Sequence, residues 1–73
     1  MEVLRKESKS GKTFRIYDNS PVWHIYEIEF LTIYKNEDGS PFYCWKPAFE
    51  PKNKLFSDLD KAKAEFEKLL LEN

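Results

Sequence analysis

The sequence predicts an α+β domain in which a small antiparallel sheet of three to four strands packs against one C-terminal helix. Two observations predict this fold. Short stretches of alternating apolar and polar residues, separated by turn signals, occupy most of the chain up to about residue 46. The last segment, residues 55–73, instead repeats its apolar residues at the spacing of an amphipathic helix. The chain has 73 residues, which suits a single domain covering residues 1–73.

Four stretches are expected to form the strands, namely residues 2–7, 13–17, 22–35 and 41–46. The turn between the first two is centred on Ser10-Gly11. The turn between the last two, residues 36–40, contains Gly39, which can supply the positive φ of a hairpin. The following segment, residues 47–54, carries two prolines and is expected to be a loop that returns to the helix.

The third stretch changes its pattern in the middle. Glu27 and Glu29 alternate with apolar residues and are expected to face water. Beyond Phe30, the apolar residues Leu31 and Ile33 take positions on the glutamate side. A β-bulge near Phe30, or a sheet covered on both faces there, is expected to explain this change.

The hairpin turn also predicts a cross-strand cluster. If the turn is centred on Asp38, Leu31 and Ile33 lie beside Trp45 and Tyr43 on the returning strand. Large apolar side chains at such paired positions stabilise a two-stranded ribbon.

The C-terminal segment is predicted to bury one face of a helix, formed by Leu59, Ala62, Phe66, Leu69 and Leu70. Ser57 is expected to be the N-cap, and Asp60, three residues later, can complete a variant of the capping box.

Composition argues against several function classes. The single cysteine, Cys44, allows no intramolecular disulfide, and with the single histidine, His24, it cannot form the usual zinc site. Neither residue has a recognisable catalytic partner in sequence, and the chain has no glycine-rich phosphate loop. The acidic pairs Glu27/Glu29 and Asp58/Asp60 are better explained by a solvated strand face and a helix N-terminus. We therefore expect no enzyme, no catalytic residue, no metal and no cofactor.

The sequence also predicts where the protein is found. It has no leader-like start and no apolar run of the roughly 18 residues needed to cross a bilayer. We therefore expect an intracellular, cytoplasmic protein without a membrane partner.

Two features indicate binding. Residues 5–15 contain five basic side chains and one acidic side chain, a net charge of +4. A later region interleaves aromatic rings with lysines, as nucleic-acid-binding proteins do. The candidate nucleic-acid-binding residues are Tyr43, Trp45, Lys46, Lys52 and Lys54, with Lys12 and Arg15 extending the basic surface.

A purely structural interpretation of the same residues places the rings in the core and the lysines in solvent. The leading function hypothesis is a small non-enzymatic domain that binds nucleic acid through the aromatic and lysine residues. The alternative is a protein-interaction module, such as an inhibitor or accessory subunit of phage or plasmid type, that uses an exposed sheet face or edge. An unpaired edge strand would also allow a homodimer.

The order of motifs resembles the WGR domain. The strand residues Tyr26-Glu27-Ile28 and the helix-start segment Phe56-Ser57-Asp58-Leu59-Asp60, with Ala62 and Phe66, carry the resemblance over residues 14–72. Where that family has Trp-Gly-Arg, this chain has Trp45-Lys46-Pro47. The resemblance implies a sheet-plus-helix fold and nucleic-acid contacts through Trp45, with Lys46 as a cationic substitute that lacks the planar fork of arginine.

Overall fold

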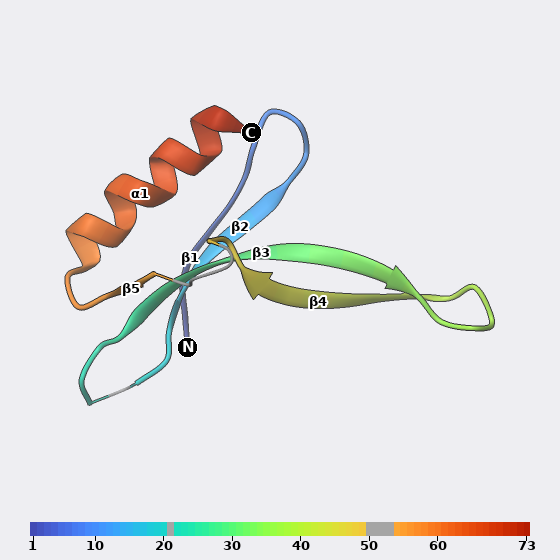
Figure 1. The fold of residues 1–73 in the computed structure, drawn as a ribbon, viewed down its shortest axis with the longest axis horizontal. Coiled ribbons are helices and arrows are strands. Elements are labelled where there is room, and N and C mark those ends of the chain that lie inside the picture. Colours follow the sequence, from blue (N-terminus) through green and yellow to red (C-terminus); the bar gives the residue numbers. More distant parts are fainter. Residues whose placement is uncertain (21, 50–53) are drawn as a thin grey trace.

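In the described residues, the protein consists of a five-stranded antiparallel sheet with a helix across one face; four strands follow the order β1-β2-β3-β4, and the short β5 also pairs with β3 (Figure 1). The computed structural model describes residues 1–20, 22–49 and 54–73. The elements are β1 (Glu2–Glu7), β2 (Thr13–Asp18), β3 (Tyr26–Lys35), β4 (Pro41–Pro47), β5 (Leu55–Phe56) and α1 (Leu59–Glu72). The predicted α+β fold, with one C-terminal helix on a small antiparallel sheet, is confirmed.

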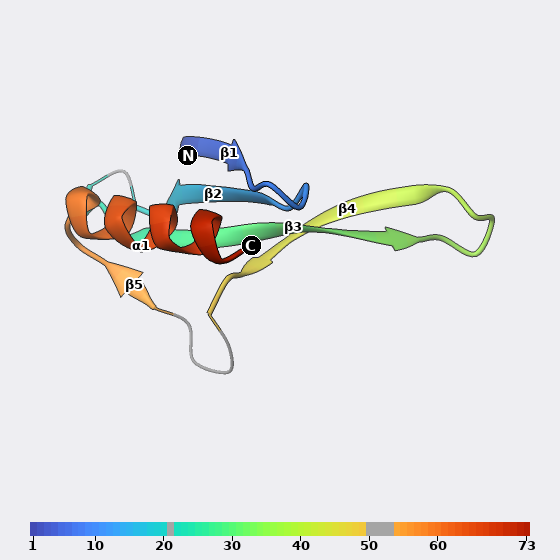
Figure 2. The same cartoon turned by 90° about the horizontal axis from the view of Figure 1, so that it is seen from above.

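The ten-residue strand β3 connects the two halves of the sheet. Its first part pairs with β2 as far as Phe30, which lies opposite Phe14. Its second part pairs with β4, and the short β5 pairs with β3 at Tyr26 and Glu27. Residues 31–45, which we call the ribbon, therefore leave the sheet as a two-stranded hairpin, visible to the right of the body in Figures 1 and 2.

The core lies between α1 and one face of β2 and β3. Among the described residues it consists of five buried side chains: Phe14, Ile16, Ile28, Ala62 and Phe66. Leu59, Leu69 and Leu70 pack against it from the helix. Alternate strand residues share a face, so the strand members of this core follow directly from the alternation in the sequence.

The start of the helix differs from the expectation. Asp58, and not Ser57, is the N-cap: its carboxylate Oδ1 accepts a hydrogen bond of 2.8 Å from the backbone N–H of Asp60. Leu55 and Phe56 pair with β3 as β5, so the chain remains extended until Asp58. Both residues are good caps, and pairing with the sheet decided between them.

The pattern change in β3 has neither of its expected explanations. The pairing of β3 with β4 runs without a shift from Glu29 opposite Pro47 to Lys35 opposite Pro41. The irregularity in register lies instead in β1, between Glu2 and Leu4. The predicted cross-strand cluster is confirmed, because Leu31 lies opposite Trp45 and Ile33 opposite Tyr43.

Candidate interaction surface on the open face of the sheet

The face of the sheet opposite α1, which we call the open face, carries a set of side chains of mixed chemistry. In the described ranges α1 is the only helix, and it contacts the other face through Ala62 and Phe66 (Figure 2). Register and alternation place the following residues on the open face: Glu2, Arg5, Arg15, Tyr17, Glu27, Glu29, Leu31, Ile33, Tyr43 and Trp45.

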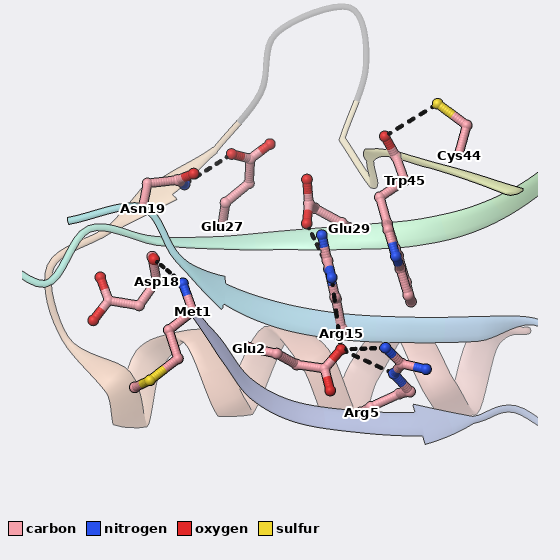
Figure 3. Close-up of polar contacts among 10 residues, drawn as sticks. All are labelled: Met1, Glu2, Arg5, Arg15, Asp18, Asn19, Glu27, Glu29, Cys44 and Trp45. Atoms are coloured by element: carbon pink, nitrogen blue, oxygen red, sulfur yellow. Dashed lines mark hydrogen bonds and ion pairs between the residues drawn. The ribbon is translucent and has the colours of Figure 1, made fainter. Parts of the chain in front are cut away.

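The indole of Trp45 lies at the centre of this face. The guanidinium carbon of Arg15 is 4.1 Å from the centroid of the ring, and that of Arg5 is 5.1 Å away (Figure 3). Arg15 also lies over the ring of Tyr17, at 4.6 Å. A weakly hydrated planar cation is well suited to stack on an aromatic face, so these contacts hold Trp45 half-buried.

Carboxylates neutralise both guanidinium groups. Arg15 Nε donates to Glu29 Oε1 at 2.7 Å, and these two side chains are only 16% and 14% exposed. Arg5 donates from Nε and Nη2 to Glu2 Oε1, at 2.9 and 2.7 Å. This hydrogen bond from Arg5 is the main reason why the pKa of Glu2 lies below its usual value. We call these four residues, together with Trp45, the Trp45 cluster.

The sequence predicts that Glu27 and Glu29 face water, but neither residue is fully exposed. Glu29 faces away from α1, but the Arg15 side chain covers it. Glu27 is half-buried and accepts a hydrogen bond of 3.0 Å from the Asn19 side chain.

Beyond the Trp45 cluster, the ribbon exposes apolar side chains on both faces. Ile33 and Tyr43 lie opposite each other on the open face and are 62% and 63% exposed. On the other face, the rings of Tyr34 and Phe42 stack with a centroid distance of 5.4 Å. Large apolar side chains that gather on a protruding element are characteristic of interaction surfaces.

The predicted nucleic-acid-binding residues that the structure describes fall on different parts of the molecule. Tyr43, Trp45 and Arg15 lie together on the open face. Lys46 lies on the α1 side, where its Nζ is 5.0 Å from the Tyr34 ring centroid. A hydrogen bond from Lys46 lowers the pKa of Tyr34.

Two further predicted lysines, Lys12 and Lys54, contact other residues than Trp45. Lys12 follows the turn after β1 and donates to Asn73 Oδ1 at 3.3 Å. Lys54 lies over the ring of Phe49 at 4.6 Å. Lys52 lies outside the described residues.

Sequence reasoning missed Glu2, Arg5 and Glu29 as members of the Trp45 cluster. The available signal was the alternation of the first strand, which places Glu2 and Arg5 near Arg15 only once the register is known. A charge excess counted along the chain could not reveal that carboxylates from other positions would pair with these cations.

His24 and Cys44 have structural partners. His24 Nδ1 donates to Asp18 Oδ2 at 2.8 Å, which helps to hold His24 at a φ of 53° in the left-handed region. A cavity of about 390 Å³ beside this pair is lined by Met1, Tyr17, Asp18, Asn19 and His24. Cys44 is half-buried, and its thiol contacts the Trp45 carbonyl at 3.8 Å.

The Asp18–His24 pair predicts a pH dependence. The hydrogen bond from His24, followed by that from the Ser20 N–H, lowers the pKa of Asp18 below its ordinary value of 3.8. The ionised carboxylate therefore stabilises the fold above that value, and this contribution is lost as the pH falls through the lower folded-state pKa. We expect Asp18→Asn to lower the urea midpoint at pH 7 and to lower it less at pH 3. Equal losses at both pH values would contradict this prediction.

The two tryptophans are expected to differ in solution. Trp23 is 78% exposed, whereas Trp45 is half-buried beneath guanidinium groups. In Trp45→Phe, the remaining Trp23 emission should be red-shifted and strongly quenched by acrylamide. In Trp23→Phe, the Trp45 emission should be blue-shifted and quenched clearly less. Equal quenching constants for the two variants would show that Trp45 is not covered.

Within the part of the chain that the structure describes, no group of three or more His, Cys, Asp or Glu side chains is arranged to hold a metal ion. In the same residues, the only helix is neither long nor apolar enough to cross a membrane.

Comparisons with protein-family models, with curated proteins and with solved structures found no match to this chain. The resemblance to the WGR domain therefore remains a prediction based on the motif order. Trp45 lies within β4 and under Arg15, so any contact through its indole would be made from the open face of the sheet.

Proposed function

We propose that the protein is a small protein-interaction module whose contact surface is the open face of the ribbon, formed by Leu31, Ile33, Tyr43 and Trp45. The observation that carries this proposal is the exposure of Ile33 and Tyr43, which lie side by side on a hairpin that protrudes from the core. Interfaces favour aromatic and large apolar side chains of this kind at their centres.

The charges on this surface favour a protein over a polyanion. Arg5 and Arg15, the cations nearest to Trp45, are paired with Glu2 and Glu29. A phosphate would have to compete with these carboxylates for the same guanidinium groups. Nucleic-acid binding depends on salt because protein cations neutralise phosphates and release their counterions, and cations that are already paired with carboxylates contribute less.

Nucleic acid remains the second candidate because of one observation. The Tyr43 ring is 63% exposed and lies near Trp45 on an open sheet face, where an unpaired base can stack. This candidate predicts binding of single-stranded oligonucleotides that weakens steeply with salt.

One experiment separates the two candidates. A photo-reactive phenylalanine analogue is placed at Tyr43, and in a matched control at Lys63, an exposed position on α1. After irradiation in cells, protein adducts are digested by protease only, and nucleic-acid adducts are shortened by nuclease. Nuclease-sensitive adducts at Tyr43 would favour the second candidate.

The protein-interaction proposal expects discrete, nuclease-resistant adducts at Tyr43 that are absent at Lys63. A crosslinked protein other than a second copy of this chain, once identified and purified, should bind the wild-type domain and should bind Ile33→Glu at least about tenfold more weakly. Binding that is unchanged by Ile33→Glu, or adducts that are identical at both positions, would overturn the proposal.

A further inference from the structure

The outer edge of β4 presents a defined set of backbone groups. Asn36 N–H donates to the Ser40 carbonyl at 2.8 Å, and Ala48 N–H donates to the Ile28 carbonyl at 2.9 Å. The two pairs lie one step beyond either end of the register that joins β3 and β4, and they continue it. Hydrogen-bonded pairs alternate along an antiparallel ladder, so the even-numbered residues of β4 bond to β3 and the odd-numbered ones point outward.

Four residues of β4 therefore direct their backbone groups away from β3: Pro41, Tyr43, Trp45 and Pro47. The two prolines lack an N–H, so this edge offers four carbonyls and only two donors, from Tyr43 and Trp45. Among the described residues, β4 pairs with β3 alone. The outer edge of β4 is therefore a short unpaired edge that ends at a proline on each side and can pair with one further strand.

We propose that the outer edge of β4 pairs with the same edge of a second copy of the chain. The two strands run antiparallel and are related by a two-fold axis at Cys44. The proposal rests on the proposed function, because it takes the ribbon as a protein-contact surface. Cys44 is the middle residue of the seven-residue strand, so this register overlaps β4 along its full length.

The backbone groups are self-complementary in this register. Tyr43 lies opposite Trp45 of the partner subunit, and both residues point outward, so the two exchange a pair of N–H···O bonds. The symmetric pair does the same, which uses all four donors of the two chains. Pro41 lies opposite Pro47 of the partner subunit, and because neither residue has a backbone N–H, no donor is left unpaired there. The weak contact of the Cys44 thiol at 3.8 Å leaves the Trp45 carbonyl a second lone pair.

The side chains are also complementary. On the α1 side, Lys46 lies opposite Phe42 of the partner subunit, and a cation beside an aromatic ring is favourable. On the open face, the Tyr43 ring meets Trp45 of the partner subunit. Lys46 is the only charged residue of β4, and the two copies of Lys46 lie about 13 Å apart, which exceeds the screening length in physiological salt.

The geometry closes at two copies. A two-fold contact uses the same surface on both chains, so neither β4 edge remains open. The other edge of the sheet, β1, carries Glu2, Arg5, Lys6 and Glu7 and a break in register between Glu2 and Leu4. Charged side chains and bulges of this kind oppose edge-to-edge pairing.

The single cysteine provides the test. Cys44 would lie opposite its own copy at a non-hydrogen-bonded position, with Cα atoms about 4.5 Å apart, within the range that a disulfide spans. Mild oxidation of the purified protein should therefore give a covalent dimer. The matched control is Cys44→Ser with Phe42→Cys, because copies of residue 42 lie about 13 Å apart across the axis. Phe42 is 43% exposed, so random collisions would crosslink the control as well.

Sedimentation equilibrium of the reduced protein completes the test with two edge variants. Tyr43→Val removes the ring but keeps the outward N–H, whereas Tyr43→Pro removes both and leaves the bonds to β3 intact. We expect Tyr43→Pro to weaken dimerisation roughly tenfold or more relative to Tyr43→Val, because two of four intermolecular hydrogen bonds are lost. Circular dichroism checks that both variants fold.

Three outcomes would overturn the inference. They are a reduced protein that stays monomeric at high concentration, equal crosslinking of Cys44 and the residue-42 control, and a dimer lost in Ile33→Glu but retained in Tyr43→Pro. The first two leave the proposed function standing if the photo-crosslinked partner still binds through Ile33. The third would move the contact between copies from the edge to the open face.

Discussion

Phe66→Ala is expected to remove about 3–5 kcal/mol from the free energy of unfolding, the typical cost of truncating a fully buried phenylalanine. The Phe66 side chain has no exposed surface and is the largest of the fully buried side chains. It joins α1 to Phe14, Ile16 and Ile28 of the sheet. A domain of this size has a total stability of only about 4–11 kcal/mol, so the variant should lose at least about a quarter of it and at the low end all of it. Urea unfolding followed by circular dichroism measures the loss.

The control for this prediction lies on the same helix. Leu71 is 85% exposed, so Leu71→Ala removes an apolar side chain without leaving a cavity and should change the stability by less than about 0.5 kcal/mol. Phe66→Leu keeps most of the volume and should fall between the two. If Phe66→Ala unfolds at the same urea concentration as Leu71→Ala, the contact between α1 and the sheet is not the core of this fold.

The elements that sequence reasoning predicted well are those set by local periodicity. The helix face of Leu59, Ala62 and Phe66 and the buried face of β2 both follow from side-chain direction in a helix and a strand. The hairpin register could be predicted for the same reason, because a short turn fixes which residues of the two strands face each other.

The details that sequence reasoning missed depend on contacts between distant segments. Ser57 and Asp58 are equally good caps in isolation, and only the pairing of β5 with β3 extends the chain through Ser57. The expectation of a bulge or a cover at Leu31 and Ile33 depends on a polar face that continues along β3. The ribbon instead leaves the sheet at that point, and Ile33 stays exposed.

The candidate site shows the same difference between features set by local periodicity and features set by contacts between distant segments. Trp45 and Tyr43 could be recognised as unusual in the sequence, and their shared face follows from strand geometry. The partners of Trp45 come from β1 and β2, which are far away along the chain. Lys46 is adjacent to Trp45 in sequence but faces the other side of the sheet, because neighbouring residues of a strand point in opposite directions.

Arg15→Met is expected to cost about 2–4 kcal/mol of unfolding free energy. Arg15 and Glu29 are 16% and 14% exposed and are joined by a 2.7 Å hydrogen bond, so removal of the cation leaves a largely buried carboxylate without its partner. The same change removes the guanidinium that lies 4.1 Å from the Trp45 ring centroid. Urea unfolding in a Trp23→Phe background, followed by Trp45 fluorescence, reports on both effects.

The second substitution separates charge from packing. In Arg15→Met with Glu29→Leu neither charge of this pair remains, and replacing both members of a buried ion pair by apolar residues is often neutral or stabilising. The double variant should therefore regain most of the stability lost in Arg15→Met. Arg15→Lys keeps the charge but lacks the planar group, so it should fall between wild type and Arg15→Met. If the double variant is as unstable as Arg15→Met, stacking on Trp45 and not neutralisation of Glu29 is the main contribution of Arg15, and the open face is held together by its aromatic contacts.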